Sequence, residues 1–226
     1  LRRNDFKAAQ HPDQFITISS YAAEQIKKYY KRESKIIFPP VDIEKFSTEF
    51  STSKNIKKGK SQTLKNHKNE KSQINHFITT SRQVTWKRLD LCIKACLETG
   101  DQLALIGDGP EHQNLVKLAN NSPLIEFLPV MDQVNLAKHL SSASAYLFPS
   151  KEPFGIAPVE ALSAGCPVIA FKEGGATDYI ISGKNGIFFE AQTSDSLIKA
   201  IKKFNQVDFD KSVVKNTTSK FAKSEF

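Results

Sequence analysis

The chain has 226 residues, which is enough for one complete domain and part of a second. No apolar run approaches the roughly 18 residues of a membrane-spanning helix, so we expect no transmembrane helix. The formal net charge of +8 raises the question of nucleic-acid binding, but residues 51–75 hold seven lysines against Glu70 and supply most of that excess. We therefore expect a cytoplasmic protein, in solution or at the inner face of the membrane, that binds no nucleic acid.

Residues 1–50 contain one strand–helix–strand pattern. A strand is predicted at Phe15–Ser19, a serine-capped helix follows as far as Tyr30, and a second strand spans Lys35–Phe38. A strand so near the first residue needs sheet neighbours that this sequence does not supply. We interpret residues 1–50 as the C-terminal end of a truncated Rossmann-like domain that begins upstream.

Residues 51–75 are dominated by Lys, Asn, Ser and Gln, and their few apolar residues are scattered. Such a segment cannot bury enough apolar surface to offset the entropy that ordering it would cost. We interpret it as a solvated linker or insertion. The alternative is a basic segment that contacts an anionic membrane or a nucleic acid.

Residues 76–205 alternate short apolar runs with segments of helical periodicity. The predicted strands are His76–Thr80, Gln102–Ile106, Leu124–Leu128, Ala145–Phe148, Pro167–Phe171 and Gly186–Phe189. The predicted helices are Lys87–Glu98, Glu111–Ala119, Gln133–Ser141, Pro158–Ala164 and residues 194–204. Such alternation is typical of parallel strands joined by crossover helices. The expected fold class is α/β, with a doubly wound parallel sheet that forms a Rossmann-like nucleotide-binding domain.

Residues 206–226 close the chain with an amphipathic pattern, in which Phe209, Val213, Val214 and Phe221 are apolar. We expect them to form a helix that returns to the first domain.

The cysteines and histidines indicate neither a disulfide framework nor a metal site. Cys92 and Cys96 lie four residues apart in an apolar helical pattern and Cys166 stands alone, which is typical of reduced core thiols. The five histidines lack the spacing of metal ligands. We therefore expect a cytosolic compartment and no bound metal.

The residues that suggest chemistry follow the predicted strands, where open α/β sheets bind their ligands. Arg82 and Lys87 follow the first strand, while Glu152 and Glu160 follow the fourth. Glycines that allow close approach of a ligand lie at Gly107, Gly155, Gly174 and Gly175. The cations suit a diphosphate, and two carboxylates beside it suit the hydroxyl groups of a sugar and a ribose.

The segment Glu152-Pro-Phe-Gly-Ile-Ala-Pro-Val-Glu160 resembles the E-x7-E segment of glycosyltransferase family four, the group 1 glycosyltransferases. Further stretches that resemble this family are residues 13–20, 36–46, 81–91, 106–111 and 174–189. The resemblance implies a GT-B architecture, in which residues 1–50 end the acceptor-side domain and residues 76–205 bind the nucleotide sugar. The family's glycine-rich acceptor loop and pocket histidine have no counterpart here and are expected upstream.

The resemblance also implies roles for single residues. Arg82 and Lys87 would contact the donor diphosphate, Glu160 the ribose and Glu152 the donor sugar, and we assign catalytic roles to Glu152, Arg82 and Lys87. The other residues implied to bind the donor are Gly107, Val130, Phe154, Gly155, Ile156 and Ala157. Pro129, Asp178 and Asn185 depart from the family's usual glycine, glutamate and threonine.

These features predict a retaining glycosyltransferase of polysaccharide biosynthesis. It would move a hexose, with a weak preference for mannose, from a GDP-sugar or UDP-sugar to a glycan or lipid-linked acceptor, without a metal or other cofactor. We expect residues 1–226 alone to bind nucleotide but to transfer no sugar. One alternative is a non-catalytic nucleotide-sugar-binding module. Another is a basic nucleic-acid-binding protein that depends on the lysines of residues 51–75.

Overall fold

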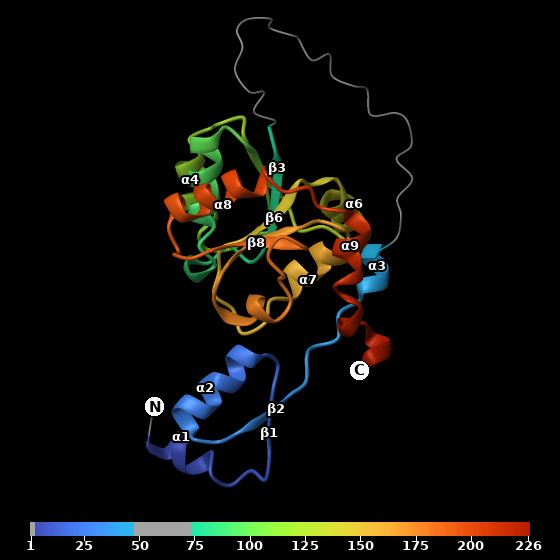
Figure 1. Ribbon diagram of the computed structural model, residues 1–226. Helices are drawn as coiled ribbons and strands as arrows, with labels where there is room; N and C mark the ends of the chain where they lie inside the picture. Colours follow the sequence, from blue (N-terminus) through green and yellow to red (C-terminus); the bar gives the residue numbers. More distant parts are fainter. Residues whose placement is uncertain (1–2, 48–73) are drawn as a thin grey trace, which may run out of the picture.

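The computed structural model describes residues 3–47 and 74–226, which we call the first part and the second part (Figure 1). The first part contains a two-stranded parallel sheet and the second part a six-stranded one. Within these residues, no helix is long and apolar enough to cross a membrane. The predicted Lys-rich linker at residues 51–75 lies almost entirely outside the described residues, so its contacts stay predictions.

The sheet of the second part is parallel throughout and has the strand order β5-β4-β3-β6-β7-β8. Its strands are β3 His76–Thr80, β4 Gln102–Ile106, β5 Ile125–Leu128, β6 Ala145–Phe148, β7 Val168–Phe171 and β8 Gly186–Phe189. The chain order reverses between β3 and β6, which is the kind of switch point where such sheets bind ligands. The predicted doubly wound α/β fold is confirmed, although β5 and β7 each begin one residue later than predicted.

Helices cover both faces of this sheet. Those of the second part are α4 Leu89–Thr99, α5 His112–Ala119, α6 Gln133–Ser142, α7 Ile156–Ser163, α8 Ser194–Phe204 and α9 Lys211–Asn216. On β6, Leu147 packs into the cluster under α4, α5 and α8, while Tyr146 and Phe148 pack into the cluster under α6 and α7. Successive side chains of a strand point to opposite sides, so consecutive apolar residues, as in β6, make both faces of the sheet apolar.

All three cysteines of the chain are buried as free thiols within these clusters. Burial raises the pKa of each thiol, to about 12 for Cys166. A thiol with so high a pKa stays protonated and unreactive at neutral pH.

The helix predicted at Lys87–Glu98 is divided in the structure. A 3₁₀ turn spans Thr85–Lys87, Arg88 adopts a left-handed conformation with φ 54°, and α4 begins only at Leu89. The Arg88 side chain is held by Asp90 at 3.1 Å and by the carbonyl of Gln192 at 3.4 Å. Lys87 therefore ends a turn and does not begin the helix. The helix predicted at residues 194–204 has those bounds in the structure, and the other predicted helices of the sheet domain differ from their predicted bounds by one or two residues.

The tail differs more strongly from its prediction. Instead of one helix over residues 206–226, α9 is followed by two 3₁₀ turns, Ser219–Phe221 and Lys223–Glu225. The tail contacts residues 41–47, because the N–H of Val41 donates to the carbonyl of Phe221 at 2.8 Å and Lys223 pairs with Asp42 at 2.9 Å.

The first part is small, and neither of its first two helices contains a buried residue. Its elements are α1 Arg3–Ala8, β1 Phe15–Thr17, α2 Ser20–Tyr30, β2 Ser34–Ile36 and α3 Ile43–Ser47, of which α1 and α3 were not predicted. The side chain of Ser19 caps α2 by accepting the N–H of Ala22. Beyond that cap, the N–H of Ser20 donates to the carboxylate of Asp178 in the second part at 2.9 Å.

Candidate functional site

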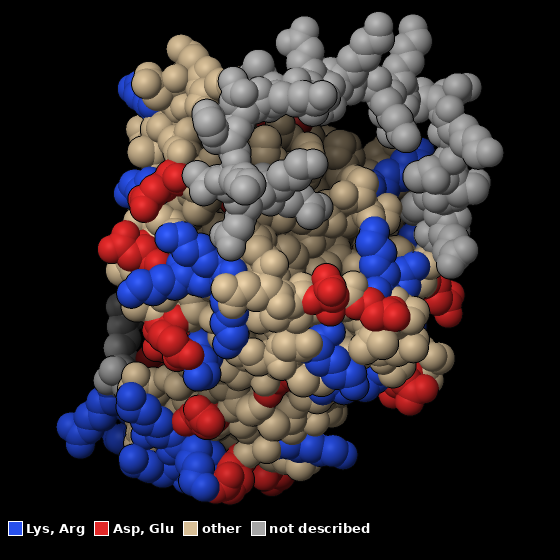
Figure 2. All heavy atoms as spheres, turned by 45° about the horizontal axis from the view of Figure 1, so that its top comes forward, with Lys and Arg blue, Asp and Glu red and all other residues tan. Residues whose placement is uncertain are grey.

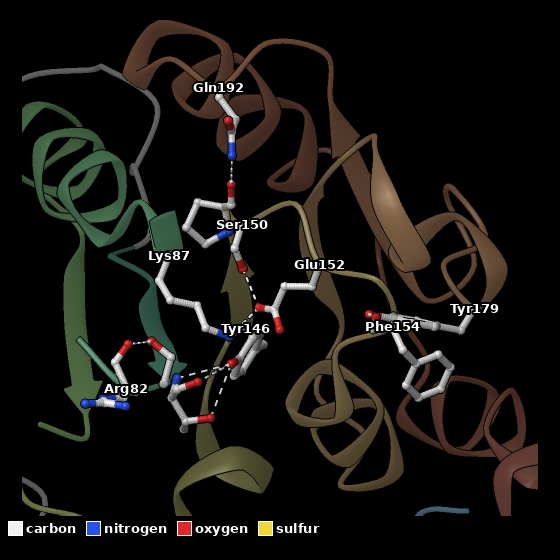
Figure 3. Close-up of polar contacts among 11 residues, drawn as sticks. Arg82, Lys87, Tyr146, Ser150, Glu152, Phe154, Tyr179 and Gln192 are labelled. Carbon is white, nitrogen blue, oxygen red and sulfur yellow. Dashed lines mark hydrogen bonds and ion pairs between the residues drawn. The ribbon is translucent and has the colours of Figure 1, made fainter. Parts of the chain in front are cut away.

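A cavity of about 470 Å³ opens at the carboxyl ends of β3 and β6, at the switch point of the sheet (Figure 3). Half of its lining residues come from the loop after β6 and the start of α7, while Ile18 and Pro39 of the first part also line it. The lining residues that we use below are Thr80, Lys87, Tyr146, Ser150, Glu152, Phe154, Gly155, Ile156 and Ala157.

Lys87 and Glu152 form an ion pair inside this cavity. The Lys87 Nζ lies 2.6 Å from Oε1 of Glu152, and the two side chains are only 16% and 14% exposed. The hydroxyl of Ser150 donates to the same Oε1 atom at 2.6 Å. Figure 3 shows the lysine and the serine reaching the carboxylate from different sides. The site therefore presents one cation and one firmly held carboxylate to any ligand.

Two glycines hold the main chain of Glu152. The N–H of Gly175 donates to the carbonyl of Glu152 at 2.8 Å. A Cβ atom on Gly174 would lie 2.4 Å from that carbonyl oxygen, and one on Gly175 would lie 2.3 Å from the carbonyl oxygen of Pro153. We expected both glycines to admit a phosphate, but here they let two loops pack main chain against main chain.

Helix α7 begins at the cavity wall. Gly155 precedes it with φ 86°, and a Cβ atom there would lie 2.7 Å from the Phe148 ring. The hydroxyl of Tyr179 donates to the carbonyl of Phe154 at 2.8 Å and fixes the approach to the helix. The N–H groups of a first helical turn have no partner within the helix, so Ile156 and Ala157 can donate to an anion in the cavity.

Glu160 lies on α7 but does not line the cavity. Its side chain is half-buried, and burial raises the pKa of the carboxyl group. Among the described residues, none donates a hydrogen bond to this carboxylate or pairs with it. A carboxylate desolvated in this way is stabilised by any donor that a ligand brings to it.

Arg82, Gly107 and Val130 are not brought to the cavity. Gln83 is fully buried and donates its side-chain N–H to the carbonyl of Gly107 at 2.8 Å, which leaves its neighbour Arg82 exposed. In Figure 3 the Arg82 guanidinium points away from Lys87 and Glu152. Gly107 packs against Ser81, since a Cβ atom there would lie 2.2 Å from the Ser81 carbonyl oxygen. Val130 is 75% exposed.

Three lining or supporting residues were missed. Ser150 lies two residues after the end of β6 and could have been found by the same strand-end rule that identified Glu152. Tyr146 lies inside a strand, where no sequence signal distinguishes it; its hydroxyl donates to the carbonyl of Thr80 at 2.9 Å. Gln192 acts from a distant loop, where its side-chain N–H donates to the carbonyl of Pro149 at 2.8 Å.

Charged groups elsewhere on the second part are largely paired or dispersed. Lys172 pairs with Glu190 at 2.8 Å, and Lys151 pairs with Glu173. Figure 2 shows Asp and Glu interspersed with Lys and Arg on the viewed face. Within residues 3–47 and 74–226, no three His, Cys, Asp or Glu side chains are grouped to hold a metal. The chain contains one short Asp-x-Asp sequence among these residues, Asp208-Phe209-Asp210. Its second carboxylate is not grouped with other possible metal ligands; it caps α9 by accepting the N–H groups of Ser212 and Val213.

Comparison with known proteins places this geometry in a family. The sequence profile of the family described as "Glycosyl transferases group 1" matches residues 60–218. The chain is 25% identical to an uncharacterized glycosyltransferase, MJ1178, of Methanocaldococcus jannaschii over 197 residues, which are 86% of this chain and 50% of that protein. The chain thus spans half the length of that relative.

Two further proteins are similar, one over a shorter stretch of sequence and one mainly in its fold. A GDP-mannose-dependent alpha-(1-6)-phosphatidylinositol monomannoside mannosyltransferase of Mycolicibacterium smegmatis is 27% identical over 140 residues, covering 55% of this chain and 37% of that protein. The crystal structure of Anabaena Alr3699/HepE in complex with UDP and glucose superimposes with a TM-score of 0.70 at 19% identity, covering 98% of this chain and 61% of that one. The profile match together with the shared fold shows that the chain belongs to the group 1 glycosyl transferases.

Proposed function

We propose that the protein transfers a hexose, with retention of anomeric configuration, from a nucleoside-diphosphate sugar to a glycan or lipid-linked acceptor. The observation that carries this proposal is the cavity, in which Lys87, Glu152 and the start of α7 meet at the switch point of the sheet. One relative is named as GDP-mannose-dependent and one structural neighbour was solved with UDP and glucose, so both GDP-sugars and UDP-sugars remain candidates.

The proposed division of labour follows from charge. A nucleoside diphosphate carries two to three negative charges, and the Lys87 ammonium with the N–H groups of Ile156 and Ala157 can stabilise them as the bond to the sugar breaks. Glu152 accepts hydrogen bonds from hydroxyl groups of the donor sugar. Glu160 does not line the cavity, and its proposed role, to accept hydrogen bonds from the ribose, rests on the family resemblance. Arg82 would have to turn inward before it could join Lys87 on the diphosphate.

The proposed compartment is the cytosol, because all three cysteines are free and buried. Metal independence is part of the proposal: Lys87 and the helix start supply the positive charge that a divalent cation supplies in other transferases. Sugar transfer by the whole protein, and its absence in residues 1–226 alone, are likewise proposals, since the relatives extend well beyond this chain.

Titration calorimetry with a nucleoside, its monophosphate and its diphosphate tests the diphosphate role of Lys87. Lys87→Ala should weaken binding of UDP or GDP by about 1.5 to 3 kcal/mol, the range for hydrogen bonds to charged groups, and should barely change binding of uridine or guanosine. Lys172→Ala is a matched control, because that lysine is also ion-paired but lies on the surface, 51% exposed. A Lys87→Ala penalty that does not grow with the number of phosphates would refute this role.

A further inference from the structure

The two oxygens of the Glu152 carboxylate have unequal surroundings. Oε1 receives both Lys87 and Ser150, each at 2.6 Å. Within the described part of the chain, Oε2 receives no donor. Because Oε1 is fully engaged, Oε2 is the atom that remains for a ligand in the cavity.

The two donors on Oε1 differ in mobility. Lys87 reaches the carboxylate through a flexible four-carbon chain, and it is also the cation that a diphosphate would attract. Ser150 is only 2% exposed and has a single side-chain torsion. Its main chain is held next to Pro149, whose carbonyl accepts the N–H of Gln192 at 2.8 Å. The serine is therefore the fixed donor and the lysine the exchangeable one.

We propose that Ser150 is a positioning residue, which keeps the Glu152 carboxylate oriented toward the sugar when Lys87 moves to the diphosphate. Without the serine hydroxyl, Oε1 would depend on Lys87 alone, and a bound diphosphate would compete for that lysine. Glu152 would then turn to follow Lys87 and lose its alignment with the sugar hydroxyl groups. This inference rests on the proposed function of the cavity.

Calorimetry with four ligands, UDP, UDP-glucose, GDP and GDP-mannose, separates the two contacts on the 226-residue chain. Ser150→Ala should leave the affinity for the preferred diphosphate within about two-fold of the wild type, while the matching sugar nucleotide binds about ten-fold more weakly, as expected for one lost hydrogen bond to a charged group. Ser150→Thr, which restores the hydroxyl, should recover the sugar-dependent affinity. If the alanine variant does not fold, Ser150→Cys keeps the shape with a weaker donor and should show a smaller loss of the same kind.

The matched control is Ser163→Ala. Ser163 is equally buried, but its hydroxyl donates to the carbonyl of Val159 inside α7 at 2.8 Å, so its loss should leave both affinities unchanged. Equal losses for diphosphate and sugar nucleotide in a Ser150 variant, or no loss of either, would overturn the positioning role while leaving the proposed function intact. A wild-type chain that binds none of the four ligands would refute the proposed function, and the role of Ser150 with it.

Discussion

The two parts of the molecule differ in how much of their apolar surface they bury within their own sheets. The second part buries a parallel sheet under helices on both faces, and the side chains of Leu147, Leu162 and Ile169 are fully buried. In the first part, α2 contains no buried residue, and Ile16 on β1 is 62% exposed. A two-stranded sheet gains little stability from its own contacts. The difference teaches that β1, α2 and β2 depend on contacts outside their own sheet, whereas the six-stranded sheet of the second part lies between two apolar clusters.

The largest expected effect tests where the boundary between the parts lies. Phe46 lies on α3, in the first part of the sequence, yet it is 1% exposed and packs into the cluster of α6 and α7. Phe46→Ala should lower the free energy of unfolding by about 3 to 5 kcal/mol, because it leaves a cavity in the core of the second part. Chemical denaturation followed by circular dichroism measures this change. A loss below about 1 kcal/mol would show that α3 is not part of that core.

Two substitutions compare the buried core of the second part with the exposed sheet of the first part. Leu162→Ala, in the fully buried face of α7, should cost about 2 to 5 kcal/mol. Ile16→Ala should change the free energy of unfolding by no more than about 0.5 kcal/mol, because the side chain is already in contact with solvent. Denaturation of both variants under one set of conditions makes the comparison. A large loss in Ile16→Ala would mean that β1 is covered in solution.

The polar contact between Ser20 and Asp178 should contribute less to stability than the packing of Phe46. Asp178 accepts the N–H and the hydroxyl of Ser20, so Asp178→Ala should cost about 0.5 to 1.5 kcal/mol at this contact and speed hydrogen exchange at the Ser20 amide. Asp132→Ala is the control within one part, because Asp132 caps α6 through the N–H of Asn135 at 2.9 Å. It should speed exchange in α6 and leave Ser20 unchanged. Unaltered exchange at Ser20 in Asp178→Ala would rule out the contact.

The smallest effect concerns Glu160 and depends on pH. Burial raises the pKa of this carboxyl group, so the folded chain holds its proton more tightly than the unfolded chain. The resulting stability is fully present below the unfolded pKa and is lost as the pH rises through the folded one. Glu160→Gln removes that loss, so it should be more stable than the wild type at pH 7, with a difference that shrinks toward pH 4. Melting temperatures across this range test the sign, and a difference that grows toward acid pH would contradict it.

Much of the second part could be predicted from its sequence, because its strands are short and mostly apolar and the loops that line the cavity follow strands. Lys87 and Glu152 were found by that rule, and the cavity brings them together. The outward orientation of Arg82 could not be foreseen, since it depends on the burial of Gln83 against Gly107. The contact between Ser20 and Asp178 joins residues far apart in the chain, so no local sequence pattern predicts it.

The three buried thiols can be used to measure how often the second part of the chain unfolds enough to expose them. Thiol reagents react with the thiolate, and Cys92, Cys96 and Cys166 are shielded from solvent as well as protonated. All three lie in the second part, so the rate at which they are labelled follows the opening of that part alone. Mass spectrometry of the labelled chain, with and without the proposed nucleotide ligand, would therefore measure whether that ligand slows the opening of the second part.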